Sequence, residues 1–144
     1  MELHELVYVS LAEWAMSTAD LTALLEQARE KNTRLNITGL LVYHRGEFTQ
    51  MLEGAKTDIF NLYATICEDV RHRAPYVLSH GSIGQRSFSH WSMAFLAPSD
   101  QSLEENPAYS SYLDTGLIEQ VLSSAKTIGR RMFLISLRDQ FLRQ

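Results

Sequence analysis

Short apolar runs along the first hundred residues predict the strands of this chain. Residues 6–9 are apolar at every position, which is typical of a strand that is buried on both faces. Four further strands are predicted over residues 37–43, 47–53, 76–83 and 92–96. A turn containing Gly46 separates the second strand from the third, so these two strands are expected to form a hairpin.

Apolar residues at helical spacing predict two helices between these strands. The first helix follows a capping box at residues 17–20 and runs to about Lys31. The second helix covers residues 59–70 and ends before Pro75. The order β-α-β-β-α-β-β indicates an α+β, ferredoxin-like fold, with a five-stranded mixed sheet and both helices on one face.

The second face of this sheet is also apolar and needs a cover. Apolar positions at helical spacing recur over residues 117–125 and 134–141, which predicts a C-terminal helical extension. We therefore expect one domain over residues 1–97, and over residues 98–144 an extension that packs on the sheet or on a partner.

Composition and charge narrow the class of protein. The net charge of −4 disfavours nucleic-acid binding, which usually needs a basic patch. The start of the chain does not resemble a signal peptide, and no apolar run approaches ~18 residues, so we expect no membrane span. The only cysteine, Cys67, has no partner within the chain for a disulfide, which favours a cytoplasmic protein. No metal site is expected, because His4, His80 and His90 are far apart in the sequence and lack a cysteine or carboxylate pattern.

One polar residue stands among apolar neighbours in the third predicted strand. Strand alternation places Gln50 on the same face as Phe48 and Leu52. A buried amide without partners costs roughly 1–3 kcal/mol, so Gln50 needs a hydrogen-bond partner. From the residues alone, a core glutamine bonded to the backbone or to a tyrosine is favoured. The alternative is that Gln50 and Tyr8 face a ligand between the helices, where Asn32 could join them. By itself, Asn32 is better interpreted as a helix C-cap or a turn asparagine.

Six pieces of the sequence follow one another in a fixed order. They are LVYVS at 6–10, Asn32, NITGLLVY at 36–43, FTQMLEG at 48–54, DVRH at 69–72 and FSHWSM at 88–93. Together they resemble the BLUF family, the sensors of blue light using flavin. The resemblance covers residues 4–96 and rests on the ordered combination, since each piece alone is weak. The tail more loosely resembles the helical extension of short, stand-alone BLUF proteins.

The resemblance implies roles for individual residues. Tyr8 matches the tyrosine that donates an electron and a proton to the excited flavin, and Gln50 the glutamine between that tyrosine and the ring. Asn32 matches the asparagine that bonds the carbonyl edge of the ring. Leu24 and Ile66 match the aliphatic residues that cover the two ring faces, and Arg71 and His72 match a segment at its polar edge, with Asp69 nearby. Leu25 and Ala28 are the other implied flavin contacts. Trp91 and Met93 match the pair associated with signal output.

The resemblance also implies a cofactor and a mode of action. The cofactor is expected to be FAD, and FMN or riboflavin could substitute because the family holds mainly the ring system. The chain has Lys31 where some relatives carry asparagine, and Thr65 where some carry arginine. Both positions are expected at the periphery of the ring, so these differences concern the binding of the phosphate or adenine end of the cofactor.

The expected function is that of a blue-light photoreceptor without catalytic output of its own. It would signal through a downstream protein, such as a response regulator or a transcription factor, or through a homo-oligomer. The competing functions are a flavin-free ferredoxin-like interaction module and a small enzyme on the same fold.

Overall fold

A computed structural model describes residues 2–44, 46–89 and 92–96 of the chain. Its elements are β1 (Leu3–Ala12), α1 (Thr18–Leu35), β2 (Thr38–His44), β3 (Glu47–Ala55), α2 (Lys56–Cys67), β4 (His72–Ile83) and β5 (Ala94–Leu96). Strands and helices therefore follow one another in the predicted order, and the ferredoxin-like α+β arrangement of two helices on an antiparallel sheet is confirmed.

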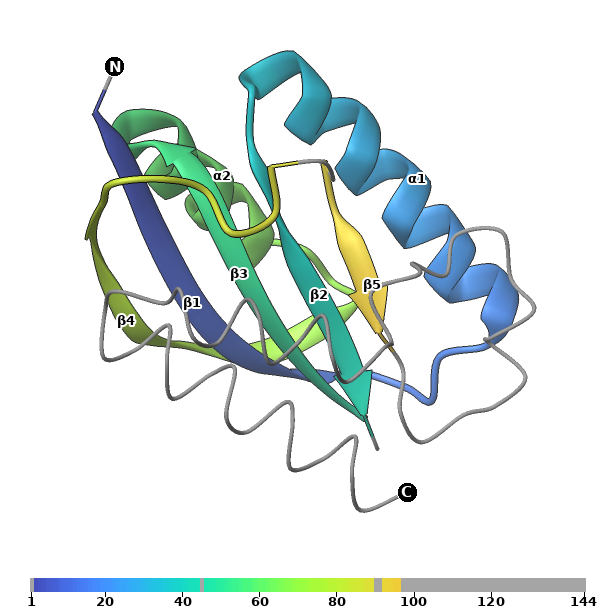
Figure 1. Cartoon of the computed structure of the whole chain (residues 1–144). Coiled ribbons are helices and arrows are strands. Elements are labelled where there is room, and N and C mark those ends of the chain that lie inside the picture. The colour runs from blue at the N-terminus through green and yellow to red at the C-terminus, as the bar shows by residue number, and fades with distance from the viewer. Residues whose placement is uncertain (1, 45, 90–91, 97–144) are drawn as a thin grey trace.

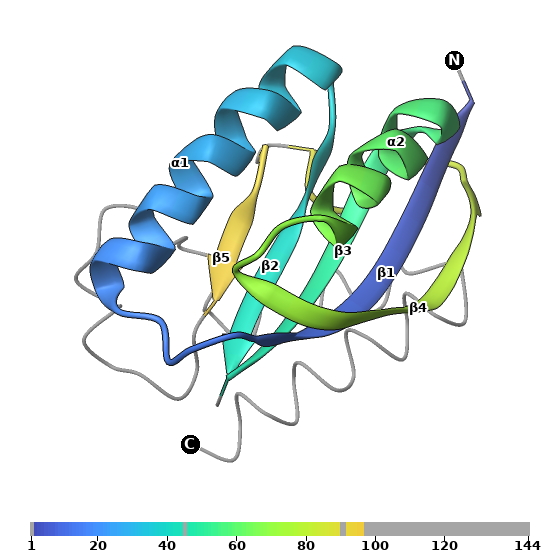
Figure 2. The same cartoon turned by 180° about the vertical axis from the view of Figure 1, so that it is seen from behind.

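The sheet has the strand order β4-β1-β3-β2-β5. β1 runs antiparallel to both β3 and β4, and β2 runs antiparallel to β3. The short strand β5 pairs in parallel with β2. Both helices lie on the same face of the sheet, α2 over β1 and β3, and α1 toward β2 and β5 (Figures 1 and 2).

Several elements extend beyond their predicted ends. β1 continues to Ala12 and β4 begins at His72, because backbone pairing with neighbouring strands proceeds through polar residues as well as apolar ones. α1 continues past Lys31 to Leu35 and ends at Asn36, whose φ of 55° is left-handed. Asn36 is therefore the C-cap, and the reading of Asn32 as a C-cap is wrong.

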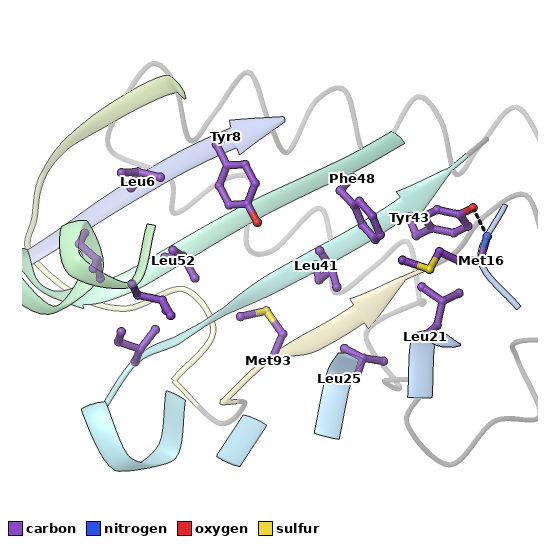
Figure 3. Packing of buried hydrophobic residues seen from close by; sticks show 13 residues of the cluster. Leu6, Tyr8, Met16, Leu21, Leu25, Leu41, Tyr43, Phe48, Leu52 and Met93 are labelled. Atoms are coloured by element: carbon purple, nitrogen blue, oxygen red, sulfur yellow. Dashed lines mark hydrogen bonds between the residues drawn. The ribbon is translucent and has the colours of Figure 1, made fainter. Parts of the chain in front are cut away.

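The main core fills the layer between the helices and the sheet. Strand residues Leu6, Tyr8 and Leu52 pack there with Leu21 of α1 (Figure 3). Ile59 of α2 belongs to the same cluster. The predicted alternation of strand faces is confirmed, because the residues assigned to one face belong to one buried cluster. At the edge of this layer, the hydroxyl of Tyr43 accepts a hydrogen bond of 3.0 Å from the backbone N–H of Met16 (Figure 3).

A buried carboxylate on the other sheet face anchors the connection after β4. Glu53 accepts hydrogen bonds from the backbone N–H groups of Ser87 at 2.7 Å and Phe88 at 3.0 Å. Thr38 donates a further bond of 3.0 Å to the same side chain. Arg86 donates to the hydroxyl of Thr38 at 2.8 Å and to the backbone carbonyl of Glu53 at 2.9 Å. Glu53 thus fixes the path of the chain several residues before β5.

The predicted C-terminal extension lies outside the described residues. The sheet face opposite the helices is nevertheless buried at Val7, Leu40 and Met51, as the apolar pattern predicted. Neither helix in the described part of the chain is long and apolar enough to cross a membrane.

Candidate functional site

A cavity of about 290 Å³ opens between α1 and α2 above the central strands. Every residue for which the sequence predicted a flavin contact, except Leu25, lines this cavity. These residues are Tyr8, Leu24, Ala28, Asn32, Gln50, Ile66, Asp69, Arg71 and His72. Segments that are far apart in the sequence therefore meet around one hollow.

Leu25 does not line the cavity. It is buried in the core cluster, whereas Leu24 and Ala28 lie on the cavity side of α1. Adjacent helix positions point about 100° apart, so Leu24 and Leu25 serve different surfaces of the same helix. Met93, predicted for signal output, is buried in the core (Figure 3), and Trp91 lies outside the described residues.

The sequence analysis missed other residues of the cavity wall. The cavity is also lined by Gln27, Lys31, Leu41, Phe48, Leu62 and Thr65. Most of these lie one helical turn from a predicted contact, as Leu62 does from Ile66, or directly across the strands, as Leu41 does from Gln50. That spacing is the signal that would have found them. Lys31 and Thr65 had been expected only at the periphery of the ring.

Tyr8 and Gln50 form a buried hydrogen-bonded pair at the floor of the cavity. They are register partners on β1 and β3, and their exposed fractions are 4% and 5%. The phenol of Tyr8 donates a hydrogen bond to Oε1 of Gln50. Burial raises the pKa of Tyr8, so this phenol keeps its proton throughout the neutral range.

The amide nitrogen of Gln50 faces Met93, the residue before β5. Its Nε2 donates to the Sδ atom of Met93 at 3.4 Å. A thioether sulfur is a weak acceptor, so this end of the amide is held more loosely than the end that faces Tyr8. Gln50 therefore connects the phenol to the residue that immediately precedes β5.

Two side chains of α1 donate hydrogen bonds to the backbone of the segment that precedes β5. Asn32 Nδ2 donates to the backbone carbonyl of Ser92 at 2.8 Å. Arg29 Nε donates to the backbone carbonyl of Met93 at 2.9 Å. Because Asn32 also lines the cavity, it links this segment to the space between the helices.

The polar rim of the cavity is built at the end of α2. Arg71 forms an ion pair with Asp69, with 2.5 Å between Nη2 and Oδ2, and it also donates to Oε1 of Gln27 at 3.1 Å. Hydrogen bonds from Arg71 lower the pKa of Asp69, and the same bonds raise the pKa of Arg71. The ring of His72 is fixed between the hydroxyl of Ser10, at 2.8 Å, and the backbone carbonyl of Ile66.

The cavity combines apolar walls with polar edges. Leu24 and Ile66 come from opposite helices and can cover the two faces of a flat ring system. Asn32, Gln50 and Arg71 carry N–H groups that can donate to carbonyls and ring nitrogens at its edge. The donor set and the shape therefore fit an isoalloxazine.

Comparison with known proteins identifies the family. The family model "Sensors of blue-light using FAD" (BLUF) matches residues 3–94, which is more than half of the chain. The chain is 38% identical over 92 residues to the photoactivated adenylate cyclase subunit beta of Euglena longa. This match covers 63% of the chain and 11% of that protein, so the chain spans about a ninth of the length of the curated relative.

Solved structures of BLUF proteins share the fold. The dark-state structure of the BLUF protein BlrB gives a TM-score of 0.69 at 26% identity, with 96% of each chain covered. BlrP1 of Klebsiella pneumoniae, solved with FMN and cyclic diGMP, gives a TM-score of 0.69 at 27% identity, over 96% of this chain and 34% of BlrP1. The family match, the fold and the cavity agree: the chain belongs to the BLUF family of flavin-binding blue-light sensors.

Proposed function

We propose that Tyr8 and Gln50 form the photochemical pair of this sensor and that the signal leaves through Met93. The observation that carries the proposal is the continuous buried contact from the phenol of Tyr8 through the amide of Gln50 to the sulfur of Met93. This path begins at the cavity and ends at the segment that enters β5.

The residue types suit a reversible photochemical step. A flavin held in this cavity would supply a chromophore for blue light and an acceptor for one electron. Tyr8 can supply that electron together with its phenolic proton, and both return to Tyr8 when the charges recombine. Gln50 can rearrange in between, because its amide has a donor end and an acceptor end of similar shape. After the cycle no atom has been gained or lost.

The energy available for signalling is small. Exchanging one neutral hydrogen bond is worth about 1 kcal/mol, and coupling between sites typically amounts to roughly 1–3 kcal/mol. Such a change can shift an equilibrium between two arrangements of Met93 and β5, but it cannot refold the sheet. The hydrogen bonds from Asn32 and Arg29 to this segment support it as the element whose equilibrium shifts.

The size of the cavity favours enclosure of the flavin ring system alone rather than of a whole FAD molecule. Ligand pockets usually measure roughly 300–1,000 Å³, and this cavity lies near the lower limit. Gln27 and Thr65 at the rim are exposed, so the chain beyond the ring would leave toward solvent there. FAD, FMN and riboflavin share the part that is enclosed, and FAD is the cofactor that the family description names.

Output is proposed to occur by contact with another protein. The Euglena relative is a subunit of an adenylate cyclase, which associates this kind of domain with a catalytic effector. For this chain we infer a separate effector, such as a response regulator or a transcription factor, or a second copy of the chain. The domain boundary near residue 97 and the cytoplasmic location also remain predictions.

The absorption spectrum of the purified protein, before and after a blue flash, tests the function. We expect a yellow protein whose flavin band shifts slightly to longer wavelength and returns in the dark without loss of intensity. A protein that stays colourless after reconstitution with flavin would favour an interaction module. Bleaching of the band with substrate turnover would favour an enzyme.

Removing the side chain of Arg71 from the rim of the cavity is expected to weaken flavin binding. Arg71→Ala removes a charged donor from the cavity, and a hydrogen bond to a charged group is worth about 1.5–3 kcal/mol, so flavin binding should weaken about tenfold or more. Fluorescence titration of the apoprotein with FMN measures the change. Arg73→Ala is the control, because Arg73 follows two residues later but pairs with Glu13 at the surface. Equal affinities of the two variants would remove Arg71 from the site.

A further inference from the structure

Two histidines from distant parts of the sequence meet where β1 pairs with β4. Nε2 of His4 and Nδ1 of His80 are 3.2 Å apart. Leu6 is the register partner of His80, so both imidazoles lie on the face of the sheet that carries the helices. The two histidines, which are far apart in the sequence, are therefore neighbours in the fold. We propose that His4 and His80 together chelate a divalent transition-metal ion of the zinc type.

The separation of the two nitrogens suits a shared ion. Zinc–nitrogen bonds measure about 2.0–2.1 Å, and two ligands at the tetrahedral angle then stand about 3.3 Å apart. The observed 3.2 Å requires almost no movement of the backbone. The rings need only turn so that both lone pairs point to one place beside the present contact.

The protonation states also suit metal binding. Burial is the main cause that lowers the pKa of His4, and the neighbouring His80 and Lys56 lower it further. In the present contact, one of the two facing nitrogens carries the hydrogen that the rings share. Binding moves that hydrogen to the other nitrogen of its own ring, so both facing nitrogens offer lone pairs and no oxidation or reduction takes place.

An aromatic side chain packs against both rings, and one of the two rings is accessible to solvent. Phe60 of α2 packs against both imidazoles, with ring centroids 5.7 Å from His4 and 5.2 Å from His80. His80 is exposed, so an ion can enter from solvent. Glu2 lies near enough to raise the pKa of His4, and its carboxylate now accepts a hydrogen bond of 3.0 Å from Ser82.

Water and Glu2 would complete the coordination. In the described part of the chain no three or more His, Cys, Asp or Glu side chains gather into a metal-binding group, so the two imidazoles are the core of the site. A carboxylate that reorients toward the ion would add a third ligand of a type that zinc accepts. The expected site is open and exchangeable rather than a closed structural one.

The site is separate from the flavin cavity. His4, His80 and Glu2 do not line the cavity. Metal binding can therefore be measured independently of the photochemistry, and the failure of one proposal would leave the other standing.

Zinc titration of the flavin-loaded protein tests the proposal. Isothermal titration calorimetry should find one site per chain, and zinc should raise the melting temperature. His80→Gln, an exposed position where a fold-preserving change is expected, should weaken zinc binding at least tenfold and abolish the thermal shift. Glu2→Gln should weaken binding by a smaller factor. A normal flavin spectrum shows that each variant is folded.

His44→Gln is the matched control, because His44 ends β2 and β2 is separated from β4 by β3 and β1. This variant should bind zinc as the parent protein does. The proposal is overturned if His80→Gln binds zinc as tightly as the parent. It is equally overturned if the parent binds zinc more weakly than about 1 mM.

Discussion

Replacing Tyr8 with phenylalanine is expected to leave a protein that binds flavin but no longer changes its absorption after blue light. The ring of Tyr8 fills the core, and phenylalanine keeps that volume. What is lost is the hydroxyl, which holds the only proton that Tyr8 can donate to Gln50. Essentially the whole reversible red shift should disappear. Steady-state absorption before and after illumination, with the flavin content measured on the same sample, checks this result.

The chain offers a close control for this substitution. Tyr63 lies beside Tyr8, with ring centroids 5.2 Å apart, and burial raises the pKa of Tyr63 to about 12. Its hydroxyl is not part of the contact between Tyr8 and Gln50, so Tyr63→Phe should photoconvert normally. Gln50→Leu should behave like Tyr8→Phe. A normal red shift in Tyr8→Phe would refute the proposed photochemical pair, whatever the other variants do.

Gly39→Ala is expected to destabilise the fold severely. Gly39 is on β2 opposite Leu52 of β3, and a Cβ atom at this position would overlap the backbone carbonyl oxygen of Met51. It would also lie 3.0 Å from the carbonyl carbon of Met51. Backbone atoms cannot rotate away as a side chain can, so the two strands must separate. We expect the free energy of unfolding to fall by about 3 kcal/mol or more, measured by urea denaturation.

A second glycine separates this steric effect from the general effect of changing a strand glycine. Gly81 is on β4 opposite Glu5, and a Cβ atom there would meet nothing within 4 Å. Gly81→Ala should therefore change the free energy of unfolding by no more than about 0.5 kcal/mol. Similar losses in the two variants would show that the close approach of β2 and β3 at Gly39 does not control stability.

Local pattern predicted the parts of the fold that depend on local rules. Alternation along residues 47–53 placed Gln50 on the core face because the side-chain period of a strand is fixed by its geometry. The end of α1 was placed too early because apolar spacing fades after Lys31, whereas the helix is continued by its backbone bonds and capped by Asn36. Propensity and spacing do not contain that information.

The site was predicted mainly by resemblance, and the rest depends on packing. The residues alone left Gln50 open between a core role and a ligand role, and the order of the motifs favoured the second. The orientation of α1 decides that Leu24 faces the cavity and Leu25 does not. The contact between His4 and His80 is set by the register of β1 against β4, which no pattern within either strand reveals.

The two ends of the Gln50 amide form hydrogen bonds of unequal strength, and this difference has a kinetic consequence. The oxygen end is bound to a phenol, while the nitrogen end is bound only to the sulfur of Met93. Turning the amide therefore gives up one strong partner and one weak partner, and a turned amide that regains an oxygen acceptor would recover much of the difference. The two orientations should then lie close in free energy. The height of the barrier between the two orientations, rather than their difference in free energy, would then set the lifetime of the state formed by a flash of light.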